Sequence, residues 1–150
     1  MTFLLFLSIA ALVLLLAAVV VGDIRHRRIP NGLCLTIAGL ALPFWIAAGP
    51  HSGATVGTQL LLWIAMVPVL LALFYFRIFG GGDIKLMAAL LLWLTPVEAL
   101  DAFFVMALAG AVLGVIVMLT SRGWRRSVPY GVAIAIGMAA PISDWFIRSI

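Results

Sequence analysis

Long runs of apolar residues, separated by short polar segments, dominate the chain. A helix needs roughly 20 apolar residues, within a range of about 17 to 25, to cross the hydrocarbon core of a bilayer. By that measure the pattern predicts six membrane-spanning helices, and the second and fourth of them are short. The expected spans are residues 1–22, 31–48, 55–76, 84–100, 102–120 and 129–146. The predicted fold class is all-α: a polytopic membrane protein with about six transmembrane helices, in a single integral-membrane domain over residues 1–150.

Prolines mark two expected helix starts and three expected kinks. Pro30 and Pro129 lie where a helix start tolerates a missing N–H. Pro43, Pro68 and Pro141 fall inside predicted spans, where neighbouring helices have to supply alternative hydrogen bonds. The first span has no lysine or arginine before it and is about twice as long as a signal-peptide core, so we expect it to be retained as a helix.

Composition agrees with a membrane protein. The chain is 66% hydrophobic and only 9% charged, far from the balance of a soluble domain. Its net charge of +4 could indicate nucleic-acid binding, but the basic residues are divided among short segments between the spans. We therefore do not expect nucleic acid as a partner. Cys34 is the single cysteine, so the chain cannot form an internal disulfide or a cysteine-based metal site.

The basic residues segregate to one side of the six-span topology. Every lysine and arginine except Arg148 lies next to the first, third or fifth connection between spans. The other side has Arg148 with the acids Glu98, Asp101 and Asp144. Since basic segments stay in the cytoplasm, we expect these three connections to be cytoplasmic and both termini to be outside.

Two aspartates come to the cytoplasmic boundary in this topology. Asp23 ends the first span and Asp83 precedes the fourth, whereas the other three acids lie about 30 Å away across the membrane. Two neighbouring carboxylates cannot both ionise easily, so a shared proton makes one a base and the other an acid. Such a pair activates water and polarises a peptide carbonyl in aspartic proteases. The pattern therefore favours acid–base chemistry at this boundary.

Three glycines, residues 80–82, lie directly before Asp83. Glycine adopts backbone conformations closed to other residues and lets a second chain approach closely, as an extended peptide substrate must. Structural alternatives stay open for each feature. The glycines could form a flexible loop, Asp83 could be a helix N-cap, and Asp23 could be a headgroup-level acid neutralised by Arg25 or Arg27.

Three segments resemble the type IV prepilin peptidases, which are membrane aspartic endopeptidases with a GxGD motif. They are DIRHRRIPN at 23–31, GGGDIKL at 80–86 and VPYG at 128–131. The GxGD of this chain is Gly80, Gly82 and Asp83, and the resemblance covers nearly the whole chain. It implies that Asp23 and Asp83 are the catalytic pair and that Gly80, Gly82 and Lys85 belong to the active-site loop.

The resemblance also implies a substrate, a location and partners. The substrate would be a prepilin-like protein with a short basic leader and a hydrophobic helix, cut on the cytoplasmic side after a leader glycine. The enzyme would lie in the prokaryotic cytoplasmic membrane, contacting membrane lipids and components of a pilus or secretion assembly. Longer relatives have paired CxxC zinc motifs and methylate the new N-terminus. This chain has neither the cysteines nor the extra region, so we expect no metal, no cofactor and no methyltransferase activity. It resembles the short Tad/Flp form, related to archaeal preflagellin peptidases.

Two other classes of function stay open. A small transporter or proton-linked channel also uses acids within the membrane, although transport sites tend to lie near the bilayer midplane rather than at span ends. A structural subunit of a pilus or secretion assembly could use Gly110 and Gly114 for close helix packing, with the acids as helix caps. Loss of activity on an isosteric Asp→Asn change would discriminate against the structural class.

Overall fold

The computed structural model describes residues 2–48, 56–120 and 129–149, which are almost entirely helical. The helices are α1 (Thr2–His26), α2 (Asn31–Ala48), α3 (Val56–Tyr75), α4 (Gly81–Leu91), α5 (Pro96–Thr120), α6 (Tyr130–Gly137) and α7 (Ala139–Ser149). Five segments are long and apolar enough to cross a membrane: α1, α2, α3, α5, and α6 with α7 taken together. The predicted class, an all-α polytopic membrane protein, is confirmed.

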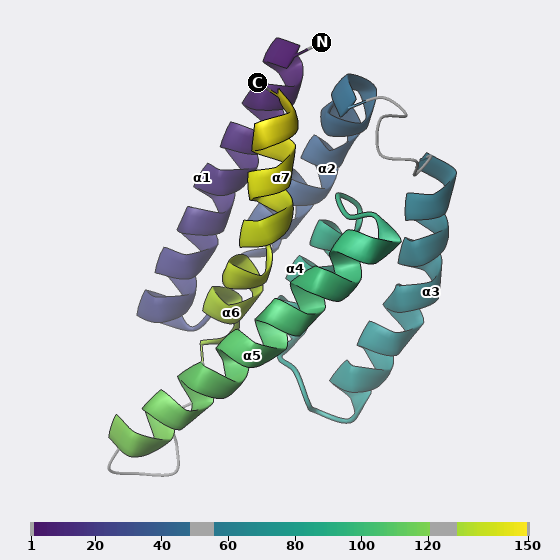
Figure 1. Cartoon of the computed structure of the whole chain (residues 1–150). Helices are drawn as coiled ribbons and strands as arrows, with labels where there is room; N and C mark the ends of the chain where they lie inside the picture. The colour runs from purple at the N-terminus through teal and green to yellow at the C-terminus, as the bar shows by residue number, and fades with distance from the viewer. Residues whose placement is uncertain (1, 49–55, 121–128, 150) are drawn as a thin grey trace.

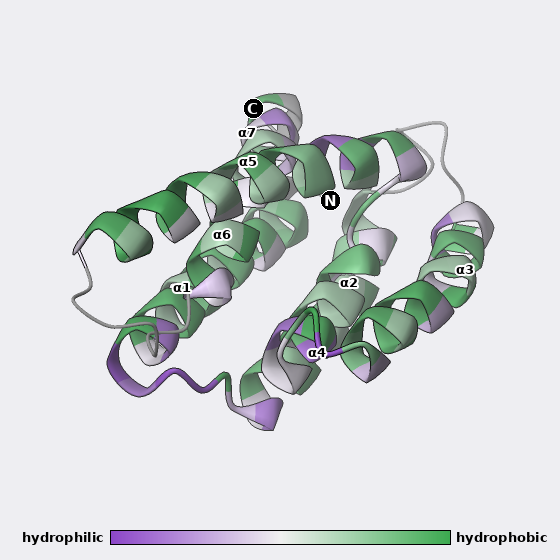
Figure 2. Cartoon of the chain, turned by 90° about the horizontal axis from the view of Figure 1, so that it is seen from below, coloured by the Kyte–Doolittle hydropathy of each residue, from purple (hydrophilic) through white to green (hydrophobic). Residues whose placement is uncertain are grey.

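The helices form a bundle with the short helix α4 inside it. Both termini lie at one end of the bundle, and the α1–α2 and α3–α4 connections lie at the opposite end (Figure 1). Helix α4 contacts α2, α3 and α6, and most of its side chains are buried. Seen from the end with these connections, the helices are largely hydrophobic, whereas the α1–α2 connection is hydrophilic (Figure 2). Large apolar side chains such as Leu119, which is 81% exposed, cover the outside of the bundle, as lipid contact requires.

Helix α4 is much shorter than the predicted fourth span. It ends at Leu91, and α5 begins at Pro96. The difference arises because a new helix, α5, starts inside the span that was predicted at 84–100. Pro96 disfavours helical backbone at Thr95. The Thr95 N–H donates to Glu98 Oε2 at 2.8 Å, and the Glu98 N–H donates to Thr95 Oγ1 at 3.3 Å, which together form a capping box. The boundaries predicted for spans 84–100 and 102–120 are therefore wrong.

Tryptophan side chains satisfy the backbone where α4 ends inside the bundle. Eleven residues of helix rise about 16 Å, roughly half the hydrocarbon core, so the last carbonyl groups of α4 lie away from water. Carbonyl groups at a buried helix end need hydrogen-bond donors. The indole N–H groups of Trp45 and Trp63 donate to the carbonyl oxygens of Leu92 and Ala88 at 2.7 and 2.9 Å. Trp93, just after α4, donates in the other direction, to the carbonyl oxygen of Ile37 in α2 at 2.9 Å. These bonds tie α4 to α2 and α3, and so position the site at its other end.

The last span is interrupted, as its proline predicts. Pro141 has no N–H to donate to the carbonyl of Gly137, and α6 ends at that residue before α7 begins at Ala139. Helices α2 and α3 continue through Pro43 and Pro68. Gly137 also allows α6 to approach α5 very closely, since a Cβ atom at that position would lie 2.6 Å from the carbonyl oxygen of Ala102. This contact fixes the depth of α6 against α5.

Candidate active site

Both predicted acids line one open cavity, of about 630 Å³, at the end of the bundle opposite the termini. The end of α1, the α1–α2 connection, the end of α3, the first turn of α4 and Tyr130 of α6 form its walls. Gly80 and Gly82 line it together with Asp23 and Asp83. The structure thus brings together four of the five predicted site residues, although the catalytic role of the acids stays a prediction.

Asp23 is held against the start of α6. Its side chain is only 6% exposed, and its Oδ2 accepts a hydrogen bond of 2.8 Å from the backbone N–H of Gly131. Gly131 leaves no room for a side chain, because a Cβ atom there would lie 2.8 Å from Oδ2 and 3.1 Å from Cγ of Asp23. This contact gives Asp23 a structural partner in α6, while the alternative of a headgroup-level acid neutralised by Arg25 or Arg27 stays open.

Asp83 lies in the first turn of α4, and its Oδ2 accepts a hydrogen bond of 3.2 Å from the backbone N–H of Gly80. The N-cap is therefore Gly80, so the alternative that Asp83 is the N-cap is wrong by three residues. Gly81 and Gly82 belong to the helix, which rules out a flexible loop over the whole of 80–82. The backbone of Gly80 has an ordinary φ of −69°, so a residue with a side chain could adopt it. Glycine is needed at this position for space, because a Cβ atom there would lie 2.9 Å from Asp83 Oδ2.

The environment of Asp83 favours its protonated form. This residue precedes the buried part of α4 and lies outside the five helices that are long enough to span a membrane. Two causes together raise the pKa of Asp83 to about 6. Burial is the larger cause, and the negative charge of Asp23 is the smaller one. The negative charge of Asp23 thus acts on Asp83 across the cavity that both residues line.

Lys85 joins the two sequence motifs next to the cavity rather than inside it. Its Nζ donates a hydrogen bond of 3.0 Å to Oδ1 of Asn31, the first residue of α2. Gly82, also in α4, lies close to the same segment, since a Cβ atom there would be 3.3 Å from Cβ of Ile29. Lys85 was predicted in the active-site loop, but it does not line the cavity. It ties α4 to the segment that follows Asp23.

Breaking this tie should lower the rate of catalysis without abolishing it. We expect Lys85→Met and Asn31→Ala each to reduce kcat about 2- to 10-fold, the equivalent of one hydrogen bond between exposed groups. In the double variant, kcat should be no lower than in the less active of the two single variants, because both changes remove the same bond. Thr36→Ala, on an exposed face of α2, is the control. Independent losses that multiply in the double variant would contradict a shared role.

Two arginines on the cavity wall have left-handed backbone. Arg27, with φ 50°, follows α1, and Arg77, with φ 57°, follows α3. This conformation costs a residue with a side chain roughly 1–2 kcal/mol. Both arginines line the cavity with Arg28, and so place positive charge around the two acids. From the sequence we expected both to mark the cytoplasmic side, and Arg27 was also a possible neutralising partner of Asp23. The other predicted anchors, Arg122, Arg125 and Arg126, lie outside the described residues.

Sequence reasoning also assigned no role at the site to Tyr130 and Gly131. Tyr130 lines the cavity, and its ring meets that of Phe79 edge-on with 5.3 Å between the ring centroids. Gly131 is the hydrogen-bond donor to Asp23. The available signal was the VPYG segment that opens the last span. Only the fold shows that this segment faces an acid more than a hundred residues earlier.

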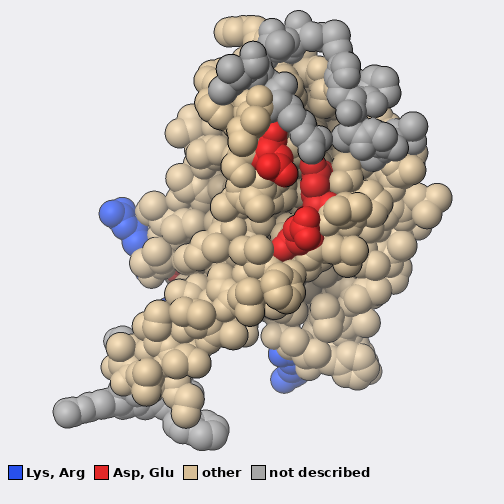
Figure 3. Space-filling view, in the orientation of Figure 1, with Lys and Arg blue, Asp and Glu red and all other residues tan. Residues whose placement is uncertain are grey.

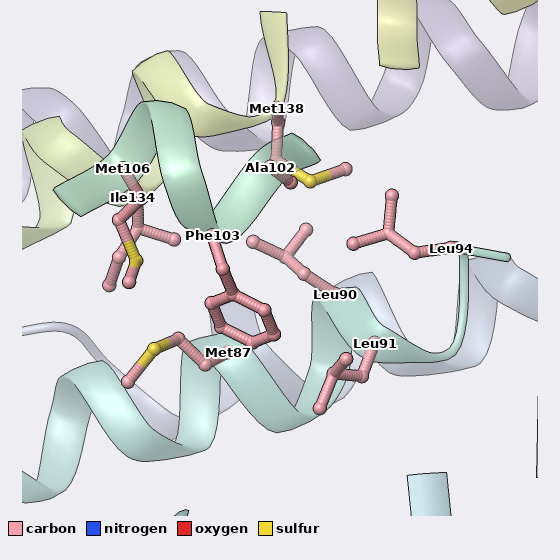
Figure 4. A pocket seen from close by; sticks show the side chains of 9 residues that line it. All are labelled: Met87, Leu90, Leu91, Leu94, Ala102, Phe103, Met106, Ile134 and Met138. Carbon is pink, nitrogen blue, oxygen red and sulfur yellow. The ribbon is translucent and has the colours of Figure 1, made fainter. Parts of the chain in front are cut away.

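A smaller cavity lies between α4, α5 and α6, one helical turn along α4 from Asp83 (Figure 4). It holds about 20 Å³, room for about one water molecule, and only apolar side chains line it, with Met87, Phe103 and Met138 among them. An apolar cavity of this size stays dry and offers no chemistry. We interpret it as a packing gap.

The remaining acids lie away from the cavity. None of Glu98, Asp101 and Asp144 lines it. In Figure 3 the visible acidic side chains gather mostly in the upper half of this face, while the visible basic side chains lie at its left edge and near its lower end. Glu98 Oε1 accepts a hydrogen bond of 2.8 Å from Trp145 Nε1, which gives this acid a structural role. No cluster of three or more histidine, cysteine or acidic side chains suited to a metal ion occurs among the described residues.

Comparison with known proteins agrees with this geometry. The model of the type IV leader peptidase family matches residues 9–115, a range that contains both acids, the glycines and Lys85 but not α6. No curated protein and no solved structure matches the chain. Since the matched range spans well over half of the 150 residues, the chain belongs to the type IV leader peptidase family.

Proposed function

We propose that this peptidase is an aspartic endopeptidase that removes the short leader of type IV pilin-like precursors, of the Flp type. The observation that carries the proposal is the pair Asp23 and Asp83 on one open cavity, with one carboxyl group buried and the other biased toward its protonated form. Family membership supports a leader peptidase. The pair of acids supports the aspartic class of peptidase mechanism.

In the proposed reaction, one aspartate is ionised and the other protonated. The carboxylate takes a proton from water as the water oxygen attacks the scissile carbonyl carbon, and the other aspartate donates its proton to the carbonyl oxygen. The resulting diol collapses when the first aspartate returns its proton to the amide nitrogen. The C–N bond then breaks, and a diol hydroxyl returns a proton to the second aspartate. Both acids regain their starting states.

The position of the cavity supports a substrate that enters from the bilayer. The hydrophobic helix of the precursor would lie in the membrane beside the enzyme and present its polar leader at the cavity. Arg27, Arg28 and Arg77 surround this end of the bundle, as expected for a cytoplasmic boundary. They also suit contact with anionic lipid headgroups. A transporter is less well supported, because both acids lie near helix ends.

The direct test uses purified protein in lipid nanodiscs with a pilin-like precursor from the same genome. Mass spectrometry should show a single cut after the leader glycine, and replacing that glycine with a bulky residue should prevent it. In inside-out membrane vesicles the leader should be released without detergent, which tests the cytoplasmic orientation. Cleavage within the mature helix, or none with any pilin-like precursor, would contradict the proposed substrate.

The pH dependence of cleavage follows from the raised pKa of Asp83. A carboxylic acid donates a proton only in its neutral form, which is present below the pKa and lost above it. Since this pKa is about 6, kcat/KM should fall as the pH rises through about 6, approaching tenfold per pH unit above it. Initial rates across a constant-ionic-strength buffer series measure this effect. A rate that stays flat into the alkaline range would exclude Asp83 as a proton donor.

A further inference from the structure

The two acids are held in different ways, although each accepts a backbone hydrogen bond. The bond from Gly131 to Asp23 is 2.8 Å long and buried, and it joins helices that are far apart in the sequence. The bond from Gly80 to Asp83 is 3.2 Å long, exposed and local to the start of α4. A tighter bond in a less polar place favours the charged form of its acceptor more strongly. The contacts therefore distinguish the two carboxyl groups.

Helix α6 adds to this difference. Gly131 is the second residue of α6, where a backbone N–H has no partner within the helix. The partial positive charge at a helix start favours a neighbouring negative charge. The contact of α6 with α5 at Gly137, two turns further along, fixes where this helix start lies. Asp23 thus accepts from a donor that the fold holds in place.

We propose that Gly131 is a positioning residue whose backbone N–H holds Asp23 as the carboxylate that takes the proton from water, which leaves Asp83 as the acid that protonates the scissile carbonyl. This assignment rests on the proposed function and specifies which acid does what. The raised pKa of Asp83 agrees with it.

The charged groups around the pair are compatible with this division. From the end of α1 and the connection after it, Arg27 and Arg28 line the cavity, and Arg77 lines it from the end of α3. From α4, Asp83 is the second acid, and from α6, Tyr130 contributes its phenol ring to the same wall. The three arginines lower the cost of one negative charge in the cavity, whereas a second would meet the repulsion of the first.

Gly131→Ala tests the positioning role. An added methyl group would lie within 3.1 Å of three atoms of Asp23, so the carboxylate must move away from the N–H. We expect kcat to fall about 10- to 100-fold with KM nearly unchanged, because the carboxylate loses its position rather than the enzyme its affinity for the substrate. Gly39→Ala, on α2 with no atom within 4 Å of the new methyl group, is the matched control and should keep the wild-type rate. A Gly131→Ala enzyme with the wild-type rate would overturn the proposal.

Infrared difference spectroscopy tests the assignment even if Gly131→Ala does not fold. At one pH unit below the Asp83 pKa of about 6, the C=O stretch of a protonated carboxyl group should disappear in Asp83→Asn and remain in Asp23→Asn. The opposite result would overturn the assignment. Failure of the proposed function has a different signature, since both Asn variants would then still cleave the precursor.

Discussion

Asp23→Asn and Asp83→Asn should each reduce the rate of leader cleavage by at least about 1,000-fold while the protein still folds. Asparagine keeps the size of the side chain, and its carbonyl oxygen still accepts the N–H of Gly131 or of Gly80, so neither helix start loses its partner. What disappears is the ability to take up or release a proton. Cleavage of the precursor in nanodiscs, followed by gel shift and mass spectrometry, measures the loss.

The double variant separates a catalytic pair from two independent structural acids. If the two aspartates act as one unit, removing both should cost no more than removing one, since either single loss already stops proton transfer. Asp101→Asn, an exposed acid on α5 away from the cavity, is the matched control and should leave the rate unchanged. Single variants that keep substantial activity would mean that both acids are structural, and the assembly or transport classes would then be favoured.

The pairing of Asp23 and Asp83 was predictable because it depends on topology alone. Apolar runs and the segregation of basic residues placed both acids at the same end of the bundle, and a helix needs no tertiary detail to bring its end there. The start of α5 was also readable, since Thr95, Pro96 and Glu98 form a capping-box sequence. The apolar run across it led instead to a span of 84–100, because hydropathy does not detect a helix start within a hydrophobic segment.

The partner of Asp23 was not predictable in the same way. Gly131 donates a hydrogen bond across 108 positions of the chain, and the donor is a backbone N–H that any non-proline residue has. Only the depth of α6, fixed where Gly137 meets α5, brings that group to the acid. The conformations of Arg27 and Arg77 were likewise hidden, because a sequence marks left-handed backbone clearly only when glycine or asparagine occupies it.

Trp93→Ala should lower the free energy of unfolding by about 3–5 kcal/mol, the largest stability effect that we expect from a single truncation in this chain. The Trp93 side chain is 0% exposed and packs against the rings of Phe44 and Trp145, with centroids 4.8 and 6.2 Å away. Its removal opens a cavity where α4 gives way to the segment before α5. Reversible unfolding in mixed micelles measures the change, and Phe104→Ala, whose ring is 66% exposed on α5, is the control.

Trp93→Phe separates the hydrogen bond from the packing. Phenylalanine retains an aromatic ring but loses the indole N–H that donates to the Ile37 carbonyl. Ile37 lies within α2, so its carbonyl keeps its helical partner, and we expect a smaller loss of about 0.5–1.5 kcal/mol, the net contribution of one hydrogen bond. If Trp93→Phe is as stable as the wild type, the indole N–H is dispensable and packing alone holds α4. The expected smaller loss would mean that the bond from the Trp93 indole to α2 helps to hold the end of this half-length helix inside the apolar bundle. Asp83 would then owe its position in part to bonds at the far end of α4.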